Sequence, residues 1–477
     1  MNRLIDRAFS RKTRLFAGLL LTGLVMGTVP CAALPDSTLS LETAVKLALA
    51  QNPDLQAAQN RFSSSEIAWK KQRNSFLPDL SLSSSGSRQA GKSVDPVSGD
   101  YTASAYTRFS INLSSSLTLF NGFANTSTLH QTVANRNAAA ADLARARQGI
   151  VYSVAQEFIQ SLIARSFISV EKENRQAQAE LLEQISAFYQ AGRRPVADLY
   201  QQQAEIAASE YRLEEADRAY QVAVMNLLLI LGMDPDQALR PEEPQVEAIM
   251  KRLETLIGEA ANEADPDTRP DIAAQKNRVL AARHMLRVAR SGRYPRLSAS
   301  AGVGSSYSSS IPESNLEDQL LDRNLSASVS LNLSLPVFDR GQTGLEVAAA
   351  KIQVENENLN LRQQQLQAAA EIRQARLNWE NASRQLASAQ KQLTFARAAL
   401  NSMQDRYRAN AATLTEVSQS RSQYRQASYN HAAARYTRLL RGLEILFSNG
   451  DEYNLLKLVS ESSLDAVVPP ALKGEEE

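Results

Sequence analysis

Residues that carry catalysis or bind metals are scarce in this sequence. Its 477 residues include one cysteine, Cys31, and three histidines, His130, His284 and His431, which lie far apart in the sequence. None of the histidines has a carboxylate or a cysteine at a spacing typical of metal ligands. A single cysteine excludes an internal disulfide, and no cluster of acid, base and nucleophile is evident. We therefore expect no enzyme activity, no metal site and no cofactor.

The first 33 residues have the pattern of a signal peptide. A basic start precedes the short apolar run from Leu15 to Val29, and Cys31-Ala32-Ala33 offers small residues for cleavage. The run is too short to span a membrane comfortably. Lipidation of Cys31 is an alternative that the preceding Pro30 disfavours. Cleavage would leave 47 basic and 50 acidic residues and no cysteine, which suits export and argues against a nucleic-acid partner.

Two long stretches are almost free of helix breakers. Residues 124–191 and 342–409 each contain 68 residues, and the first holds one glycine, Gly149, and no proline. At 1.5 Å per residue each would form a helix of roughly 100 Å. Each is preceded by a segment in which apolar residues alternate with Ser, Asn or Thr, which predicts strands with one apolar face. These segments are 109–120 and 324–335.

The two strand-and-helix segments belong to a tandem duplication. Phe120 and Phe338 are 218 positions apart, as are Tyr189 and Tyr407 at the ends of the long helices. Upstream, Asn52-Pro53 matches a second X-Pro pair at an offset of 217. Such self-similarity indicates two halves of one structure rather than two unrelated domains.

The predicted boundaries follow from this duplication and from the turn residues. We expect a signal peptide at 1–33, a first repeat at 34–231, an insertion at 232–268, a second repeat at 269–449 and a partly disordered tail at 450–477. Each repeat should hold a helix, a β-hairpin and a long helix that turns into a returning helix. The expected strands are 79–87, 106–120, 297–307 and 324–336, with loops at 88–104 and 308–323, and the returning helices are 196–231 and 414–447.

The four strands pose a burial problem. No Lys, Glu or Asp lies between Ile111 and Phe120 or between Leu325 and Phe338, and no second sheet is available to cover the apolar face. We therefore expect this face to contact lipid. Four strands leave unpaired edges in lipid, and a closed barrel needs about eight or more. The sequence thus predicts a homo-oligomer. The residues expected to face lipid are Phe109, Ile111, Leu113, Val329, Leu331 and Leu333.

This chain resembles the TolC family of outer-membrane efflux proteins. The resemblance covers residues 38–449. It depends on Leu41-Glu42 through Asn52-Pro53, on the duplicated plan, and on the turns Tyr189-Gln-Ala-Gly192 and Tyr407-Arg-Ala-Asn410. It implies a mainly α fold with a membrane β-barrel: a homotrimer with twelve strands in the Gram-negative outer membrane and a twelve-helix antiparallel coiled-coil tunnel through the periplasm. It also implies that residues 232–268 form an equatorial band.

The resemblance also implies where function would lie. An acidic ring around the periplasmic aperture would fall at Glu416, with Gln419 where a second acid is common, while a basic lock residue is replaced by Ala412. A periplasmic adaptor would dock at the two turns. The turn residues are Gly192, Arg193, Arg194, Asp198, Tyr407 and Asn410.

The implied role is the exit duct of a tripartite efflux pump or a type I secretion system, with an inner-membrane RND, ABC or MFS transporter.

Two alternatives stay open at this point. A periplasmic coiled-coil structural or adaptor-like protein would leave the alternating strands unexplained, and an exported hydrolase would lack a catalytic cluster. The sequence does not indicate the transported substrate.

Overall fold

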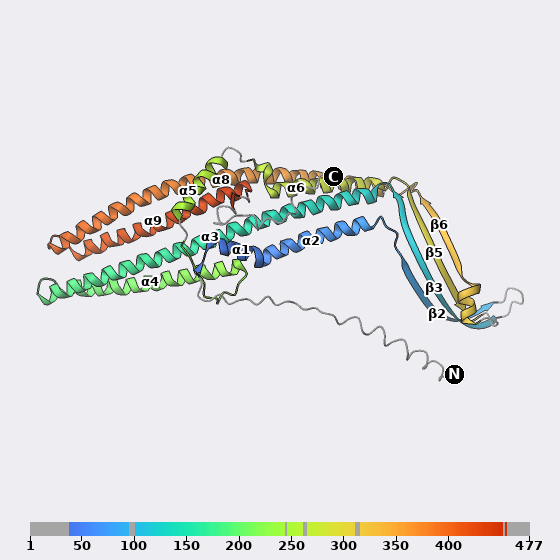
Figure 1. Ribbon diagram of the computed structural model, residues 1–477, viewed down its shortest axis with the longest axis horizontal. Coiled ribbons are helices and arrows are strands. Elements are labelled where there is room, and N and C mark those ends of the chain that lie inside the picture. Colours follow the sequence, from blue (N-terminus) through green and yellow to red (C-terminus); the bar gives the residue numbers. More distant parts are fainter. Residues whose placement is uncertain are drawn as a thin grey trace, which may run out of the picture. The chain divides into compact units, whose positions relative to one another are not determined.

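The computed structural model describes residues 38–94, 101–243, 246–260, 265–310, 315–451 and 454–455. They belong to one compact unit that begins at Thr38. The predicted signal peptide and residues 456–477 lie outside the described residues. The unit consists mainly of long helices, with a four-stranded sheet that continues from one end of them (Figure 1). No helix among the described residues combines the length and the apolar composition of a transmembrane helix.

The first half contains four helices and a hairpin. In order these are α1 (Leu41–Gln51), α2 (Pro53–Asn74), β2 (Ser81–Val94), β3 (Tyr101–Asn121), α3 (Ala124–Gln190) and α4 (Val196–Leu231). The helix starts carry clear sequence signals. The Ser40 side chain accepts a hydrogen bond from the backbone of Thr43 at the start of α1, and the Asn52 side chain caps α2, whose first residue is Pro53.

The second half repeats this order. It contains α6 (Pro270–Ser291), β5 (Arg296–Ser308), β6 (Ser326–Ser334), α8 (Gln342–Arg408) and α9 (Leu414–Asn449). The two long helices α3 and α8 have 67 residues each, one fewer than predicted. Between the halves lie β4 (Arg240–Pro241), which pairs with β1 (Thr38–Leu39), the helix α5 (Val246–Ala260), and the 3₁₀ turn η1 (Pro266–Thr268).

Equivalent residues perform equivalent roles in the two halves. The Asn52 amide donates to the carbonyl of Ile230, near the end of α4, at 2.7 Å. At the matching position Arg269 donates to the carbonyl of Ser448, near the end of α9, at 3.2 Å. These pairs are offset by 217 and 218 positions, as the duplication predicts. The following turns use glycines with φ of 73° and 76°, a conformation that favours glycine.

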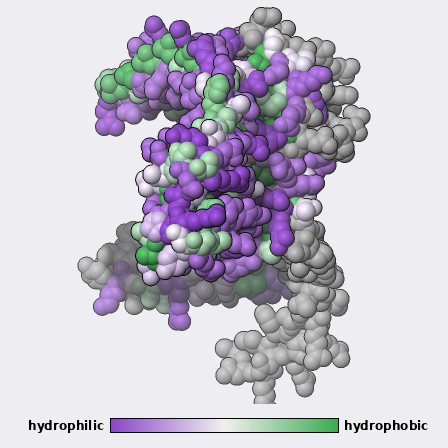
Figure 2. Space-filling view, turned by 90° about the vertical axis from the view of Figure 1, so that its left-hand side faces the viewer, coloured by the Kyte–Doolittle hydropathy of each residue, from purple (hydrophilic) through white to green (hydrophobic). Residues whose placement is uncertain are grey.

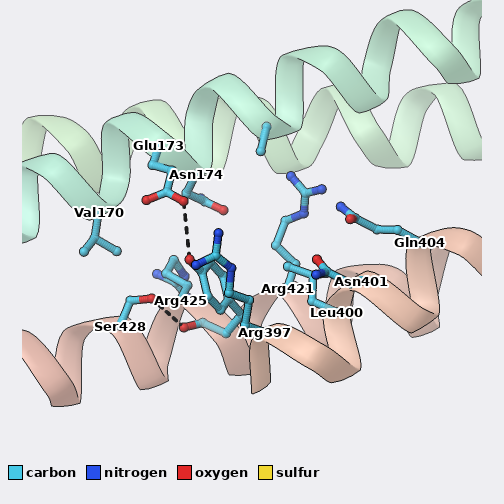
Figure 3. Close-up of a pocket in the computed structure, with 12 residues that line it drawn as sticks. Val170, Glu173, Asn174, Arg397, Leu400, Asn401, Gln404, Arg421, Arg425 and Ser428 are labelled. Atoms are coloured by element: carbon cyan, nitrogen blue, oxygen red, sulfur yellow. Dashed lines mark hydrogen bonds between the residues drawn. The ribbon is translucent and has the colours of Figure 1, made fainter. Parts of the chain in front are cut away.

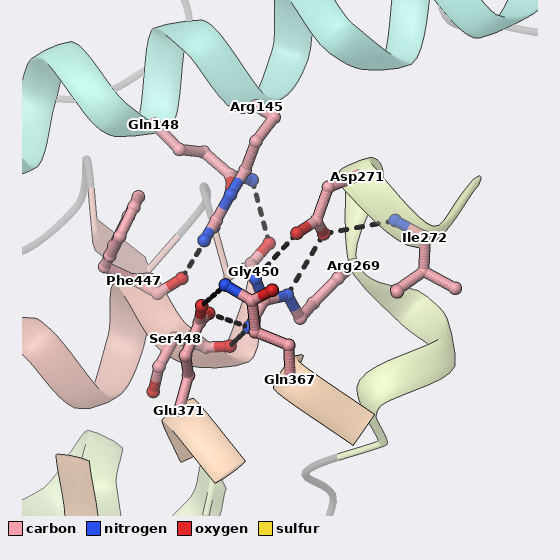
Figure 4. Close-up of polar contacts among 10 residues, drawn as sticks. All are labelled: Arg145, Gln148, Arg269, Asp271, Ile272, Gln367, Glu371, Phe447, Ser448 and Gly450. Carbon is pink, nitrogen blue, oxygen red and sulfur yellow. Dashed lines mark hydrogen bonds and ion pairs between the residues drawn. The ribbon is translucent and has the colours of Figure 1, made fainter. Parts of the chain in front are cut away.

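In the second half, Arg269 has become the centre of a buried polar network (Figure 4). Its guanidinium is 3% exposed and forms ion pairs with Asp271 at 2.7 Å and Glu371 at 2.8 Å. Arg145 of α3 donates to the carbonyl of Phe447 at 2.9 Å and stacks on its ring. The arginines thus satisfy carbonyls at the end of α9, which an isolated helix leaves unpaired, and fasten α9 to α3, α6 and α8.

The main hydrophobic core lies midway along the helices. It joins α1, the middle of α3, the end of α4, α5 and α9 around Phe158 and Leu228. Gly442 of α9 permits the closest approach, because a Cβ atom there would lie 2.1 Å from the Cδ2 atom of Leu253 in α5. Leu455, within the predicted tail, is also completely buried in this core.

The sheet has the order β2-β3-β5-β6 and is antiparallel throughout. The predicted loop at 88–104 is largely wrong. Ladder pairing continues from Arg88 to Val94 on one strand and from Tyr101 on the other, which leaves residues 95–100 outside the described residues. Continuous backbone pairing outweighs the glycine at position 91, which had suggested a loop. The predicted loop at 308–323 contains α7 (Leu316–Asp318) and a π-helical turn, η2 (Gln319–Arg323).

Candidate functional site

One face of the sheet carries most of its apolar side chains, on β3, β5 and β6 and at Leu82 of β2, whereas Ser84, Gly86 and Arg88 of β2 share this face. The ladder register aligns Leu82, Leu113, Val303 and Ala327 in one row, and Leu117, Ala299 and Leu331 in another. Because side chains alternate between faces, the six residues expected to contact lipid share this face. On β6, Val329 is 84% exposed and Leu331 is 71% exposed in the single chain. If this face contacted water, these apolar side chains would remain exposed to it.

A β-bulge changes the predicted face near the end of β3. The register shifts between Thr118 and Phe120, so that Phe120 pairs with Leu297. The simple alternation had placed Leu119 on the apolar face, but the bulge puts Phe120 in the apolar row that Leu297 and Leu333 form. Bulges insert one extra residue and reverse the alternation beyond them.

The opposite face of the sheet is polar but carries little charge. Its rows contain serine, asparagine, threonine and glycine, and facing hydroxyls bond directly, as between Ser81 and Ser114 at 2.9 Å and between Ser85 and Ser110 at 2.8 Å. The sheet therefore separates an apolar face from a hydroxyl-lined face. This is the division that a membrane strand with a wet interior requires.

The two hairpin turns at the far end of the long helices share one geometry. Gly192 has φ of 67°, and Asn410 at the matching position has φ of 57°. The next amides, of Arg193 and Ala411, donate to the carbonyls of Phe188 and Arg406. These bonds close both helices in the left-handed capping turn that glycine and asparagine favour.

Arg194 links the two turns within one chain. Its guanidinium lies 4.3 Å from the ring centre of Tyr407, donates to the Tyr407 carbonyl at 3.3 Å, and lies 3.8 Å from the carboxylate of Asp198. Arg194 is therefore engaged within the chain, whereas its neighbour Arg193 is exposed.

Tyr407 belongs to a small hydrophobic cluster at the tips. It is 1% exposed and packs with Ile185 of α3 and Val417 of α9. The cluster also contains Leu181, Ala412 and Leu414. Burial raises the pKa of Tyr407, and its hydroxyl has no hydrogen-bond partner among the described residues. Tyr407 is thus part of the contact that joins the hairpins, and is not accessible to an adaptor in this conformation.

Glu416 is exposed in the first turn of α9, and Gln419 lies one turn further along, also exposed. The Glu416 carboxylate accepts bonds from the backbone and hydroxyl of Thr413, at 2.7 and 2.9 Å, which completes a capping box. These bonds lower the pKa of Glu416. The surface around the tips is mostly hydrophilic, with scattered hydrophobic patches (Figure 2).

A buried carboxylate below the tips was not found by sequence reasoning. Glu171 of α3 is completely buried and pairs with Arg425 of α9 at 3.2 Å and Arg212 of α4 at 3.7 Å, and it accepts a bond from Tyr429. Burial and the Glu171 carboxylate raise the pKa of Tyr429. Buried carboxylates usually require such partners. Only the three-dimensional arrangement brings these partners together.

Two of the histidines meet in the folded chain. His130 and His284, remote in sequence, stack with their ring centres 5.3 Å apart. Burial lowers the pKa of His284, with Arg287 and His130 contributing. No group of three or more His, Cys, Asp or Glu that could hold a metal ion occurs among the described residues.

Comparison with known proteins identifies relatives of this chain. The outer membrane efflux protein family model matches residues 44–233 and 267–445. The chain is 25% identical over 420 residues to the pyoverdine export outer membrane protein OpmQ of Pseudomonas putida, covering 85% of this chain and 86% of that protein.

Solved structures agree with this match. The Campylobacter jejuni CmeC outer membrane channel superposes with a TM-score of 0.74 at 19% identity, over 86% of this chain and 85% of that one. The outer membrane protein VceC of Vibrio cholerae gives 0.71 at 18% identity, over 86% and 96%. Because the family model covers most of the chain, this protein belongs to the outer membrane efflux protein family and is located in the outer membrane of a Gram-negative bacterium.

Proposed function

We propose that three copies of this chain close into one channel, with twelve strands in the outer membrane and the helices forming a tunnel into the periplasm. The main support for this proposal is that both edges of the sheet are open. Among the described residues, the outer edges of β2 and β6 have no pairing partner, although lipid cannot satisfy unpaired backbone groups. A second copy added head to tail would pair β6 with β2 and, repeated, would close a ring.

The helical layer supports the same contact. The neighbours α2, α3, α6 and α8 follow the order of the strands to which they connect, so α2 and α8 lie at the edges. Along α8, four apolar residues seven positions apart are 58–68% exposed. They are Leu345, Ile352, Leu359 and Leu366. A heptad of this kind is typical of a coiled-coil seam, and Ile67 on α2, 66% exposed, is available on the opposite edge.

The channel would serve as the exit duct of a tripartite efflux pump or a type I secretion system. The family consists of outer-membrane channels rather than enzymes, and the similarity to a pyoverdine export protein supports an export role. An adaptor protein in the periplasm would dock at the tips, where Arg193 is exposed, and an RND, ABC or MFS transporter in the inner membrane would supply the energy. Glu416 would supply one carboxylate per copy to the aperture.

Reconstitution of the purified protein in a planar lipid bilayer tests this function. Discrete, repeatable conductance steps are expected, because a closed ring would enclose the hydroxyl-lined face of the sheet. Absence of conductance from correctly folded protein would contradict a channel. That result would favour a structural protein instead. The apolar face of the sheet and the family membership argue against this alternative.

A further inference from the structure

A pocket below the hairpin tips has no role in the proposed channel. It lies between α3 on one side and α8 and α9 on the other (Figure 3). Its cavity of about 160 Å³ is several times the roughly 30 Å³ that a water molecule occupies in the liquid. The residues that line it all come from one chain.

Arg421 of α9 is the most unusual residue of this pocket. Its side chain extends from α9 toward α3 (Figure 3) and the residue is only 4% exposed. The Nε and Nη1 atoms are buried and have no hydrogen-bond partner among the described residues. Burial lowers the pKa of Arg421, an effect that the charges of Glu180 and Glu205 oppose without forming ion pairs with it. A buried cation without hydrogen bonds is costly, so this site is electrostatically incomplete.

The remaining charges around the cavity are also mainly positive. Arg397 of α8 and Arg425 of α9 line it, and Arg397 is exposed. Arg425 is partly neutralised by the neighbouring Glu171. One lining residue is acidic, Glu173, whose carboxylate accepts a bond from the hydroxyl of Tyr424 at 3.3 Å. The lining itself holds three guanidinium groups and one carboxylate, while Glu171 acts on Arg425, and Glu180 and Glu205 act on Arg421, from outside it.

We propose that this pocket binds a small oxyanion of the phosphate or sulfate class. Guanidinium groups recognise tetrahedral oxyanions through paired N–H donors, and Arg421 holds two such donors unused. The amides of Asn174, Asn401 and Gln404 add neutral donors from α3 and α8. A bound oxyanion would contact α3, α8 and α9 together, and so would bridge the two hairpins.

Isothermal titration calorimetry of the full-length, detergent-solubilised protein with sodium phosphate tests this proposal. The buffer contains chloride at matched ionic strength, so that general salt effects cancel. We expect saturable binding at one site per chain. Arg421→Gln should weaken it by at least about tenfold, because two charge-assisted bonds are lost. The matched control is Arg384→Gln, which changes an arginine of α8 whose side chain is 81% exposed and should leave the affinity unchanged.

Several outcomes would overturn the proposal. Absence of saturable binding to the wild-type protein would show that the pocket is empty or is filled by a carboxylate of a neighbouring chain. Equal affinity in the wild type and Arg421→Gln would place the anion elsewhere. Arg397→Gln changes an exposed residue of the pocket, so its folding is not at risk. It should weaken binding about threefold or more, and an unchanged affinity there would overturn the proposal even if Arg421→Gln failed to fold.

Discussion

Arg194→Leu should loosen the contact between the two hairpin tips. The substitution removes the stacking on Tyr407, worth about 1 kcal/mol at a partly exposed site, and the bond to the Tyr407 carbonyl, worth about 1 kcal/mol at its length of 3.3 Å. The sum of about 2 kcal/mol corresponds to a roughly thirtyfold shift toward separated tips. The ion pair with Asp198 is lost as well, but it lies within one turn and does not join the hairpins.

Hydrogen exchange measured by mass spectrometry provides the assay. Peptides that cover the turns at 190–196 and 408–414 should lose protection by roughly thirtyfold in Arg194→Leu, whereas peptides from the main core should not change. Arg193→Leu is the matched control, because its side chain is exposed at the same turn. Equal protection in the two variants would refute the conclusion that Arg194 joins the tips, and would leave the hydrophobic cluster as their sole connection.

Three further predictions concern the sheet, the core and the aperture. Leu331→Arg should destabilise the membrane-inserted protein by about 2–4 kcal/mol, while Asn332→Arg on the polar face should be tolerated, and equal effects in denaturant titrations would show that the assigned faces are wrong. Gly442→Ala should lower the melting temperature, because overpacking costs about 1–3 kcal/mol, whereas Gly149→Ala, where a Cβ would meet no atom within 4 Å, should raise it. Glu416→Gln preserves an acceptor for the capping box but removes the charge, so single-channel recordings should show weaker cation selectivity with normal assembly; unchanged selectivity would place the constriction elsewhere.

The elements that could be predicted from sequence are those with local signals. The helix α4 has the predicted bounds, Val196 to Leu231, because Pro195 precedes its first turn and Gly232 terminates it. The long helices α3 and α8 end within one residue of expectation, just before Gly192 and Asn410, which adopt positive φ. Residue alternation also predicted which side chains share a face on β3 up to the bulge and on β6, because side chains alternate along a strand.

The features that could not be predicted depend on tertiary contacts. Nothing in the dipeptide Arg193-Arg194 indicates which arginine reaches the other hairpin. The bulge near Leu119 reverses a face without a glycine or proline to mark it. In the sequence, Glu171 and Arg421 resemble the solvated charged residues of any long helix. Both are buried, because the two helical hairpins pack against each other at these positions of α3 and α9. Residue patterns indicate the helices and strands well, but they do not show which charged residues become buried between them.

We propose that this chain functions as a closed ring of three copies. Native mass spectrometry of the mature protein, released from detergent, tests it most directly, because the method counts chains in the intact assembly. We expect a single species with three times the mass of the mature chain. A stable, folded monomer would contradict it, because the open edges of β2 and β6 and the exposed heptad of α8 would then need no partner.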